Sequence, residues 1–282
     1  FAQVTLIERD YLTDSGLYFE GSKYDPDNPS ENPPSEGNTA YRFGKKITPY
    51  GPSPMDVVGD YVYVAWYKGD MAERNVMLSR RLITDGQWVH LTLPHQHIGY
   101  RGDPYIGDSH NYITVKVCTV DNTIHMIYDM HSYEADEYGE DNYFNYSVSI
   151  PGGAVVDDSN WTTSYLFENQ EGGKTKRNYL KEGLNYEDGT YPELARTATG
   201  ELIYNMRYGG SGNGDNSHSY YDGSDWSDQT TFNIGRQPVS DNRYNIYGSF
   251  KYLHGKYRAG FAIRYANRMS FDPTYSHNSG LY

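Results

Sequence analysis

Short runs of β-branched and aromatic residues with a period of two recur along the chain, and Gly, Asn, Asp or Pro interrupts them about every 8 to 12 residues. A sustained spacing of about 3.6 residues between apolar positions, which would predict an amphipathic helix, is hard to find. The pattern is typical of an all-β protein in which many short strands form a sandwich or a barrel-like array.

Four stretches share one hairpin pattern, in which a strand, a tight turn and a second, more apolar strand follow one another. They cover residues 57–67, 117–131, 194–208 and 250–265. Their turns are Gly59-Asp60, Asp121-Asn122, Thr199-Gly200 and His254-Gly255. Residues of these types supply the positive φ that hairpin turns need, so we predict four β-hairpins.

A Gly/Asp/Ser-rich turn that ends in Trp follows three of the hairpins. These turns cover residues 85–88, 158–161 and 223–226. Successive hairpin turns are roughly 55 to 80 residues apart, which is longer than a WD40 unit and right for four strands with decorated loops. We therefore expect a β-propeller of four-stranded antiparallel blades.

The fourth hairpin lies near the end of the sequence, and no Trp turn follows it. Because a propeller either closes on itself or leaves an unpaired edge, we expect residues 1–282 to be one propeller domain that forms the front part of a longer protein. Within it, residues 20–40 contain Pro29, Pro33 and Pro34 and predict a solvated loop. That loop follows a first strand region, Val4 to Phe19.

The net charge of −13 argues against a nucleic-acid partner, because a duplex binder needs a basic surface. No apolar stretch approaches the roughly 18 residues of a membrane span. The single Cys118 rules out a disulfide framework, and no CxxC or CxxH spacing indicates a structural zinc site. The chain starts at Phe1, as a processed export precursor or a trimmed sequence would, and we expect a secreted, periplasmic or cell-surface protein.

Tyr is more abundant than Gly, with 31 residues against 29. Aromatic faces stack on the C–H surfaces of sugars while amides and carboxylates bind hydroxyls, so this composition fits an exported carbohydrate-handling β-protein. Tyr is also simply a good strand residue with one apolar face and one wet end. Composition alone leaves both interpretations open.

Equivalent strands of a propeller end on one face near the axis, so residues at the ends of the second hairpin strands can converge. These residues are Tyr67 with Lys68, His131, Arg207 and Arg264. A histidine and two arginines at equivalent positions in an acidic protein predict a pocket for an anionic ligand, although any single strand-end Arg can be merely solvated.

Two histidines come together in the second hairpin unit. His110 precedes the first strand of that hairpin and His131 follows the second, so antiparallel pairing places them side by side. A third metal ligand at suitable spacing is not evident, and imidazole titrates near neutral pH, so we interpret the pair as acid/base groups. His125 lies inside a strand and is expected to be structural.

These positions also carry a family resemblance. The motif at residues 107–111, Gly-Asp-Ser-His-Asn, is followed by His131, by Tyr191-Pro-Glu-Leu and by Met-Arg207-Tyr. In type, order and spacing this set resembles the ulvan lyases of polysaccharide lyase families 24 and 25, which are seven-bladed propellers with BNR-type repeats. The resemblance runs from about Pro49 to the end of the chain.

The resemblance implies β-elimination at a uronic acid, the glucuronate or iduronate linked to sulfated rhamnose in ulvan. It implies that His110 and Tyr191 are the proton-transfer pair, and that Arg207 with His131 holds the carboxylate. A guanidinium beside Tyr191 would favour the phenolate that such a base requires. Further substrate contacts would come from Asn111, Tyr247 and Arg264, with Arg268 as the competitor of Arg264.

The elimination itself implies no cofactor, whereas a structural divalent cation, Ca or Zn, is known in these families. We assign no ligands to it: His90, His95 and His97 have metal-like residue types, and the acidic stretch from Glu134 to Asp141 is either a calcium loop or a solvated loop. The expected partner is a sulfated uronic-acid polysaccharide, ulvan, and the expected state is a monomer.

Two other function classes stay open. A sialidase-like glycoside hydrolase would need an arginine cluster with a carboxylate pair or a Tyr–Glu couple, for which Glu193 beside Tyr191 is available. No intact Ser-x-Asp-x-Gly-x-x-Trp box of sialidase blades is present. A non-catalytic carbohydrate-binding propeller is the second alternative. Which uronic acid is accepted, and whether cleavage is endolytic, stays undecided.

Overall fold

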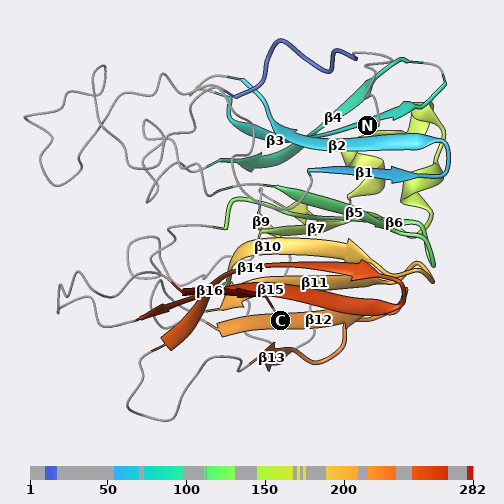
Figure 1. Cartoon of the computed structure of the whole chain (residues 1–282). Helices are drawn as coiled ribbons and strands as arrows, with labels where there is room; N and C mark the ends of the chain where they lie inside the picture. The colour runs from blue at the N-terminus through green and yellow to red at the C-terminus, as the bar shows by residue number, and fades with distance from the viewer. Residues whose placement is uncertain are drawn as a thin grey trace, which may run out of the picture.

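The structure is a computed structural model in which antiparallel sheets follow one another along the chain (Figure 1). It describes residues 10–17, 54–69, 73–84, 86–97, 111, 113–130, 145–167, 170–171, 174–175, 189–208, 215–232, 243–265 and 278–281. These residues contain strands and only three short helices, so the predicted all-β class is confirmed.

Four larger sheets keep their strands in sequence order. The first consists of β1 (Met55–Val58), β2 (Tyr61–Tyr67), β3 (Asn75–Leu82) and β4 (Val89–Gln96). The second consists of β5 (Thr114–Cys118), β6 (Thr123–Ile127) and β7 (Tyr146–Val148). The third consists of β10 (Gly189–Arg196), β11 (Leu202–Tyr208), β12 (Asp215–Tyr221) and β13 (Thr230–Phe232). The fourth consists of β14 (Arg243–Leu253), β15 (Lys256–Tyr265) and β16 (Asn278–Leu281), and β8 (Gln170–Glu171) pairs with β9 (Lys174–Thr175) in a small fifth sheet.

All four predicted hairpins are confirmed as the first two strands of the four larger sheets. Their turns contain Gly59, Asn122, Gly200 and Gly255, each with positive φ as the residue types predicted. The four turns lie at the same end of the sheets, on the right in Figure 1. The second strands therefore all end on the opposite side of the molecule.

Two details differ from the sequence prediction. Among the described residues, the second and the fourth sheets have three strands each instead of four, and the short helices η1 (Gly153–Val155), η2 (Asp158–Asn160) and α1 (Thr163–Leu166) follow β7. This segment buries Trp161, Leu166 and Phe167, so it packs on the sheet without pairing with it as a further strand. The described residues 10–17 form one bridge, Gly16 to Lys68, and no strand, and residues 20–40 lie outside the described part.

The first strands of successive sheets are neighbours, since β1 contacts β5, β5 contacts β10 and β10 contacts β14. This is the inner-strand order of a propeller.

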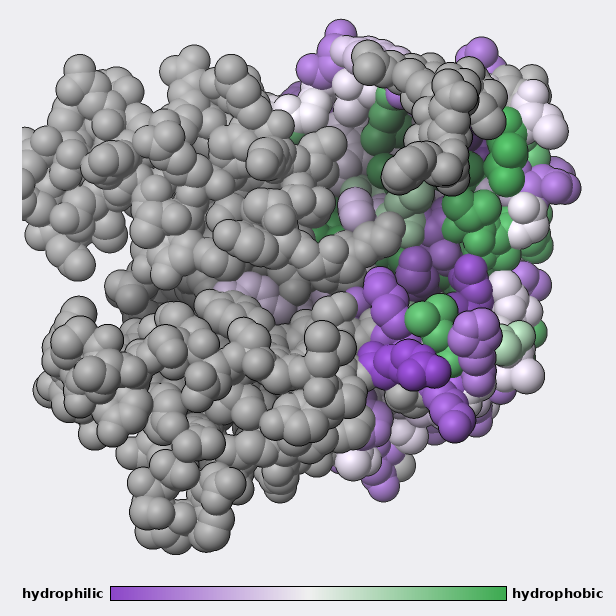
Figure 2. Space-filling model, in the orientation of Figure 1, coloured by the Kyte–Doolittle hydropathy of each residue, from purple (hydrophilic) through white to green (hydrophobic). Residues whose placement is uncertain are grey.

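Two apolar clusters fill the first two spaces between sheets, one around Tyr63, Leu78 and Met126, the other around Tyr204 and Trp226. In the view of Figure 2, hydrophobic surface gathers in the upper half and hydrophilic surface in the lower half of the described part.

A charged contact ties three inner strands together. The carboxylate of Asp56 on β1 accepts hydrogen bonds from the backbone N–H of Val117 at 2.9 Å, from Nη1 of Arg196 at 2.5 Å and from Nζ of Lys116 at 3.2 Å. These donors belong to β5 and β10, so one buried carboxylate links the first, second and third sheets.

In the part of the chain that the structure describes, no helix has both the length and the apolar character needed to cross a membrane.

Candidate active site

The strand ends opposite the hairpin turns hold the residues that the sequence singled out. Tyr67, Arg207 and Arg264 lie at or next to the ends of β2, β11 and β15, and Tyr191 lies near the start of β10. Because these strands alternate in direction, all four positions belong to one side of the molecule (Figure 1). His110 and His131 lie outside the described residues.

Tyr191 and Arg207 are in direct contact. A β-bulge interrupts the pairing of β10 with β11 between Thr190 and Glu193, and Tyr191 within it takes a left-handed conformation with φ of +58°. Bulges redirect a side chain from the regular alternation of a strand. Here the phenol ring lies under the guanidinium of Arg207, whose Cζ is 4.8 Å from the ring centroid.

A row of buried polar side chains continues from Arg207 across the third sheet. Thr190 on β10 and Asn216 on β12 are its direct cross-strand neighbours, and directly paired residues of antiparallel strands lie on the same face. Thr190 is 9%, Arg207 5% and Asn216 2% exposed. We call these three residues the Arg207 row.

A second polar row lies two residues away on the same face of the sheet and consists of Glu193, Asn205 and His218. Glu193 Oε1 is 3.8 Å from Nζ of Lys251 on β14, so this face is turned toward the fourth sheet. Burial lowers the pKa of His218, which favours a neutral imidazole. The space between the third and fourth sheets is thus lined by polar groups from the third sheet.

The predicted cluster of His90, His95 and His97 is split by the alternation of β4. His90 is exposed, and its Nδ1 is 2.7 Å from Oγ of Ser79. His95 and His97 lie on the buried face, where His95 Nε2 is 2.7 Å from Oδ2 of Asp129 and His97 Nε2 is 3.9 Å from Oδ1. Within the described residues, no group of three or more His, Cys, Asp or Glu side chains could hold a metal ion.

The other predicted residues are placed as follows. Asn111 is fully buried just before β5. Tyr247 is on β14 opposite Ala262, and Arg264 is on β15 opposite Tyr244. Lys68 does not join the site, because its ammonium is 3.4 Å from the carboxylate of Glu73 and more than a third exposed. Arg268 and the stretch from Glu134 to Asp141 are outside the described residues.

His125 has the structural role that its position predicted. Trp226 Nε1 donates to Tyr146 Oη at 3.2 Å, so the Tyr146 hydroxyl is directed to Nδ1 of His125 at 2.6 Å. His125 Nε2 is 2.7 Å from Oγ1 of Thr123, which donates to Asp121. Burial lowers the pKa of His125 to about 3, so the network holds a neutral imidazole.

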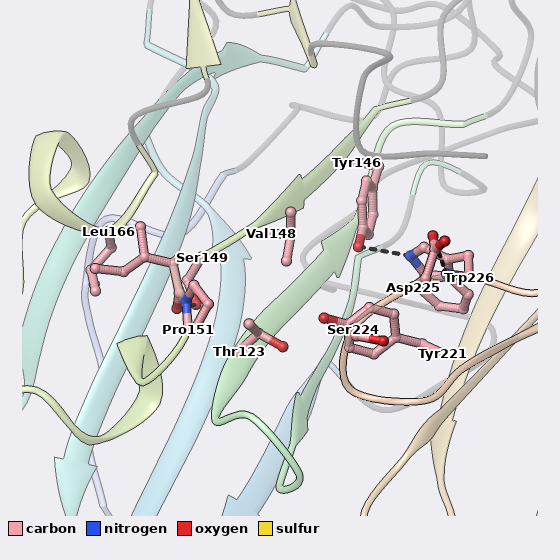
Figure 3. Close-up of a pocket in the computed structure, with 11 residues that line it drawn as sticks. Thr123, Tyr146, Val148, Ser149, Pro151, Leu166, Tyr221, Ser224, Asp225 and Trp226 are labelled. Carbon is pink, nitrogen blue, oxygen red and sulfur yellow. Dashed lines mark hydrogen bonds between the residues drawn. The ribbon is translucent and has the colours of Figure 1, made fainter. Parts of the chain in front are cut away.

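A pocket of about 280 Å³ lies beside this network, at the hairpin-turn end of the sheets (Figure 3). Three of its polar wall residues are already hydrogen-bonded to residues outside the wall: Tyr146 to His125, Tyr221 to Asp121 and Ser224 to Asp222. The pocket lies at the other end of the strands from Arg207, and none of the site residues predicted from the sequence lines it. We therefore place the candidate site at the Arg207 row.

Sequence reasoning missed Asp129 and Asn216. A signal for Asp129 was present, because His95 and His97 continue the every-second-residue spacing of Leu91 and Leu93, and buried histidines on a core face need a hydrogen-bonding partner. Asn216 had no comparable signal, since only the register of β11 with β12 brings it beside Arg207.

Comparison with known proteins agrees with the fold and with the resemblance. A family model described as a BNR repeat-containing family member matches residues 61–270, and the chain belongs to that family. The crystal structure of polysaccharide lyase Uly1 superposes with a TM-score of 0.76 at 31% identity, over 91% of this chain and 57% of that one. A PL25 ulvan lyase structure, at 14% identity and a TM-score of 0.51, shares the fold.

The curated relatives are ulvan lyases. The chain is 38% identical over 302 residues to the short isoform of Alteromonas sp. (strain LOR), covering 99% of this chain and 56% of that protein. It is 36% identical over 297 residues to a long isoform of Alteromonas sp., covering 100% of this chain and 29% of that protein. The predicted resemblance is confirmed, and the chain spans little more than half of the short isoform.

Proposed function

We propose that the protein is a polysaccharide lyase that cleaves ulvan by β-elimination at the uronic acid next to sulfated rhamnose. The observation that carries this proposal is the Tyr191–Arg207 contact, a phenol and a guanidinium 4.8 Å apart at the strand-end side of a chain related to ulvan lyases. A carboxylate-binding cation beside a proton-transfer group is what elimination requires.

In the proposed reaction, Arg207 and His131 bind the uronate carboxylate, which makes the C5 hydrogen more acidic. One member of the His110/Tyr191 pair removes that proton, and the C–H electron pair moves toward the carboxylate to give an enolate-like intermediate. The electron pair then forms the C4–C5 double bond as the C4–O bond breaks. The other member gives a proton to the departing oxygen. The products are an unsaturated uronyl end and a new chain end, and these steps require no cofactor.

The guanidinium has a second role in this proposal. Positive charge beside a phenol favours the phenolate, which is the form that can accept a proton. The same charge faces the electron density that moves onto the carboxylate as C5 loses its proton, so it stabilises the intermediate. Because a polymer of this kind cannot cross a membrane, the proposal includes an exported enzyme.

Ultraviolet absorbance tests the proposal, because only elimination produces a double bond conjugated with the carboxylate. We expect incubation with ulvan to give this chromophore together with new chain ends, and a panel of other polyuronates to define the accepted uronic acid. New reducing ends without the chromophore would indicate a hydrolase, and binding without products a carbohydrate-binding propeller. Either result would reject a lyase.

A further inference from the structure

The side chain of Asn216 is buried, and it lacks a hydrogen-bonding partner for its amide group. It is 2% exposed, and its Nδ2 has no acceptor among the described residues. An amide N–H₂ withdrawn from water costs free energy when it is left without a hydrogen bond. Such a group in a native protein is a candidate for contact with a bound ligand.

The register of the sheet places this amide next to the guanidinium of Arg207. Arg207 pairs directly with Asn216 across β11 and β12, so their Cβ atoms are about 4.5 to 5.5 Å apart on one face. Arg207 is itself held against the Tyr191 ring. A guanidinium stacked in this way keeps its N–H groups in its own plane, where they can bind a carboxylate.

Two neighbouring donor groups of this kind define the chemistry of a ligand. Asn216 Nδ2 and the guanidinium nitrogens only donate hydrogen bonds, so the complementary ligand group is an acceptor, and beside a fixed positive charge it is an anion. A planar carboxylate has two oxygens that both accept hydrogen bonds, so it can accept one donor from each residue.

We propose that Asn216 is a carboxylate-binding residue that donates Nδ2–H to one oxygen of the substrate uronate while Arg207 binds the other. This inference rests on the proposed function and extends it to a second residue of the same site. In the elimination, the C5–H electron pair shifts toward the carboxylate before the C4–O bond breaks, so both donors bind the intermediate more strongly than the substrate. Asn216 transfers no proton itself.

Two substitutions and a matched control test this role. Asn216→Ala removes both polar atoms, and Asn216→Asp keeps the size but replaces the donor with a like charge. Ser219 is the control: it lies on the same strand, is fully buried and has no partner for Oγ among the described residues, yet it pairs with Tyr204 in a row that faces the apolar cluster. If burial of an unpaired group is the only effect at Asn216, Ser219→Ala will behave in the same way.

We expect Asn216→Ala to lower kcat/KM on ulvan roughly 10- to 100-fold, the loss typical of a hydrogen bond to a charged group. Asn216→Asp should lose more, and Ser219→Ala should stay within about 2- to 3-fold of wild type. Circular dichroism and melting temperatures identify variants that fold. Unchanged kinetics in folded Asn216→Ala and Asn216→Asp would overturn the inference and leave the lyase proposal standing.

A binding measurement separates this inference from the proposed reaction. In a Tyr191→Phe background, calorimetry compares a uronate-containing oligosaccharide with its carboxyl-reduced form. We expect the acid to bind more tightly, and Asn216→Ala to reduce that preference by about 10-fold or more. The same preference in both proteins would overturn the inference even if ulvan is cleaved. A preference lost with Asn216→Ala supports the inference even if no elimination product forms. Absence of any preference for the acid in the Tyr191→Phe protein overturns the inference, whereas the absorbance assay alone decides the lyase proposal.

Discussion

Tyr191 combines a backbone conformation that few residues adopt with a side chain that the proposed reaction needs. A left-handed φ of +58° costs a non-glycine residue on the order of 1 kcal/mol or more. The bulge holds this conformation, and it sets the ring against Arg207 instead of in the regular alternation of β10. The strained backbone conformation therefore fixes where the ring and its hydroxyl group lie relative to Arg207.

Tyr191→Phe tests the hydroxyl group alone. The ring contact with Arg207 and the backbone conformation are both kept, so we expect the melting temperature to stay within about 2 °C of wild type. Loss of the proton-transfer group should lower formation of the unsaturated product by about 10² to 10⁴-fold. An active, folded Tyr191→Phe protein would show that the hydroxyl takes no part in proton transfer.

His125 makes the stability of the protein depend on pH. Its pKa is about 3 in the folded protein and near 6.5 when unfolded, because burial disfavours the charged ring. Between these values the unfolded chain binds a proton that the folded protein does not, so stability is present above pH 6.5 and falls as the pH drops toward 3. The loss approaches about 1.4 kcal/mol per pH unit.

Replacing His125 with Gln removes this titration and keeps a hydrogen-bonding side chain. Chemical denaturation at several values between pH 7 and pH 4 should give a shallower fall in unfolding free energy for His125→Gln than for wild type. The variant is expected to be less stable at pH 7, because Gln does not reproduce both ring contacts. Parallel curves for the two proteins would show that His125 does not account for the pH dependence.

Hairpin turns of neighbouring sheets also pack on one another. The backbone N–H of Thr119, in the turn of the second sheet, donates to the carbonyl of Gly200 at 3.0 Å. Gly200 has φ of +106°, and a Cβ there would collide with Thr119 Oγ1. Gly59 occupies the equivalent turn of the first sheet with φ of +55° and has open space around it. Gly200 is thus required both by its positive φ and by the close contact with Thr119, whereas Gly59 is favoured by its positive φ alone.

We expect Gly200→Ala to lower the unfolding free energy by roughly 2 to 4 kcal/mol, since backbone strain and overpacking add. Gly59→Ala should cost only about 1 kcal/mol, because its left-handed φ is the one that other residues tolerate best. Denaturant titration of both variants measures the difference. Equal losses would mean that the contact between the turns contributes nothing measurable.

The elements show what a sequence can and cannot predict. All four hairpins were predictable because each signal is local, a turn residue such as Gly59 or Asn122 between alternating strands. The short helices after β7 were not predictable from the sequence. Trp161 ends a Gly/Asp/Ser-rich turn like those after the other hairpins, and no local pattern indicates that the residues around it form helices. At the site, the strand-end pattern already indicated Arg207, whereas Tyr191 and the roles of both residues came from the family resemblance. Asn216 required the pairing of two strands, which no local pattern specifies.

Across the whole molecule, the sheets meet in two chemically different ways. Apolar clusters join the first sheet to the second and the second to the third. The third sheet turns its polar rows, with Arg207 and Glu193, toward the fourth. A polar face between two sheets gives up some hydrophobic stabilisation, which is the arrangement expected where a protein keeps groups for binding.

Across the whole molecule, Asp56 links β1 to β5 and β10, the inner strands of the first three sheets. Its carboxylate is 5% exposed and binds donors from β5 and β10, and Arg196 also donates to the carbonyl of Val117. Asp56→Asn keeps the shape but leaves Arg196 and Lys116 without their counter-charge. Removing one partner of a largely buried ion pair costs about 3 to 5 kcal/mol, and the partial exposure of Arg196 places the expected loss nearer 2 to 3 kcal/mol.

The exposed pair of Lys68 and Glu73 provides the matched control, because Glu73→Gln also neutralises one carboxylate. Solvent screens this pair, so the expected loss is below about 1 kcal/mol. Denaturation at low and high salt adds a second distinction: high salt should reduce any effect of Glu73→Gln and leave most of the effect of Asp56→Asn. If the two variants were equally stable, the charge at Asp56 would not link the three sheets, and their association would depend on the apolar clusters alone.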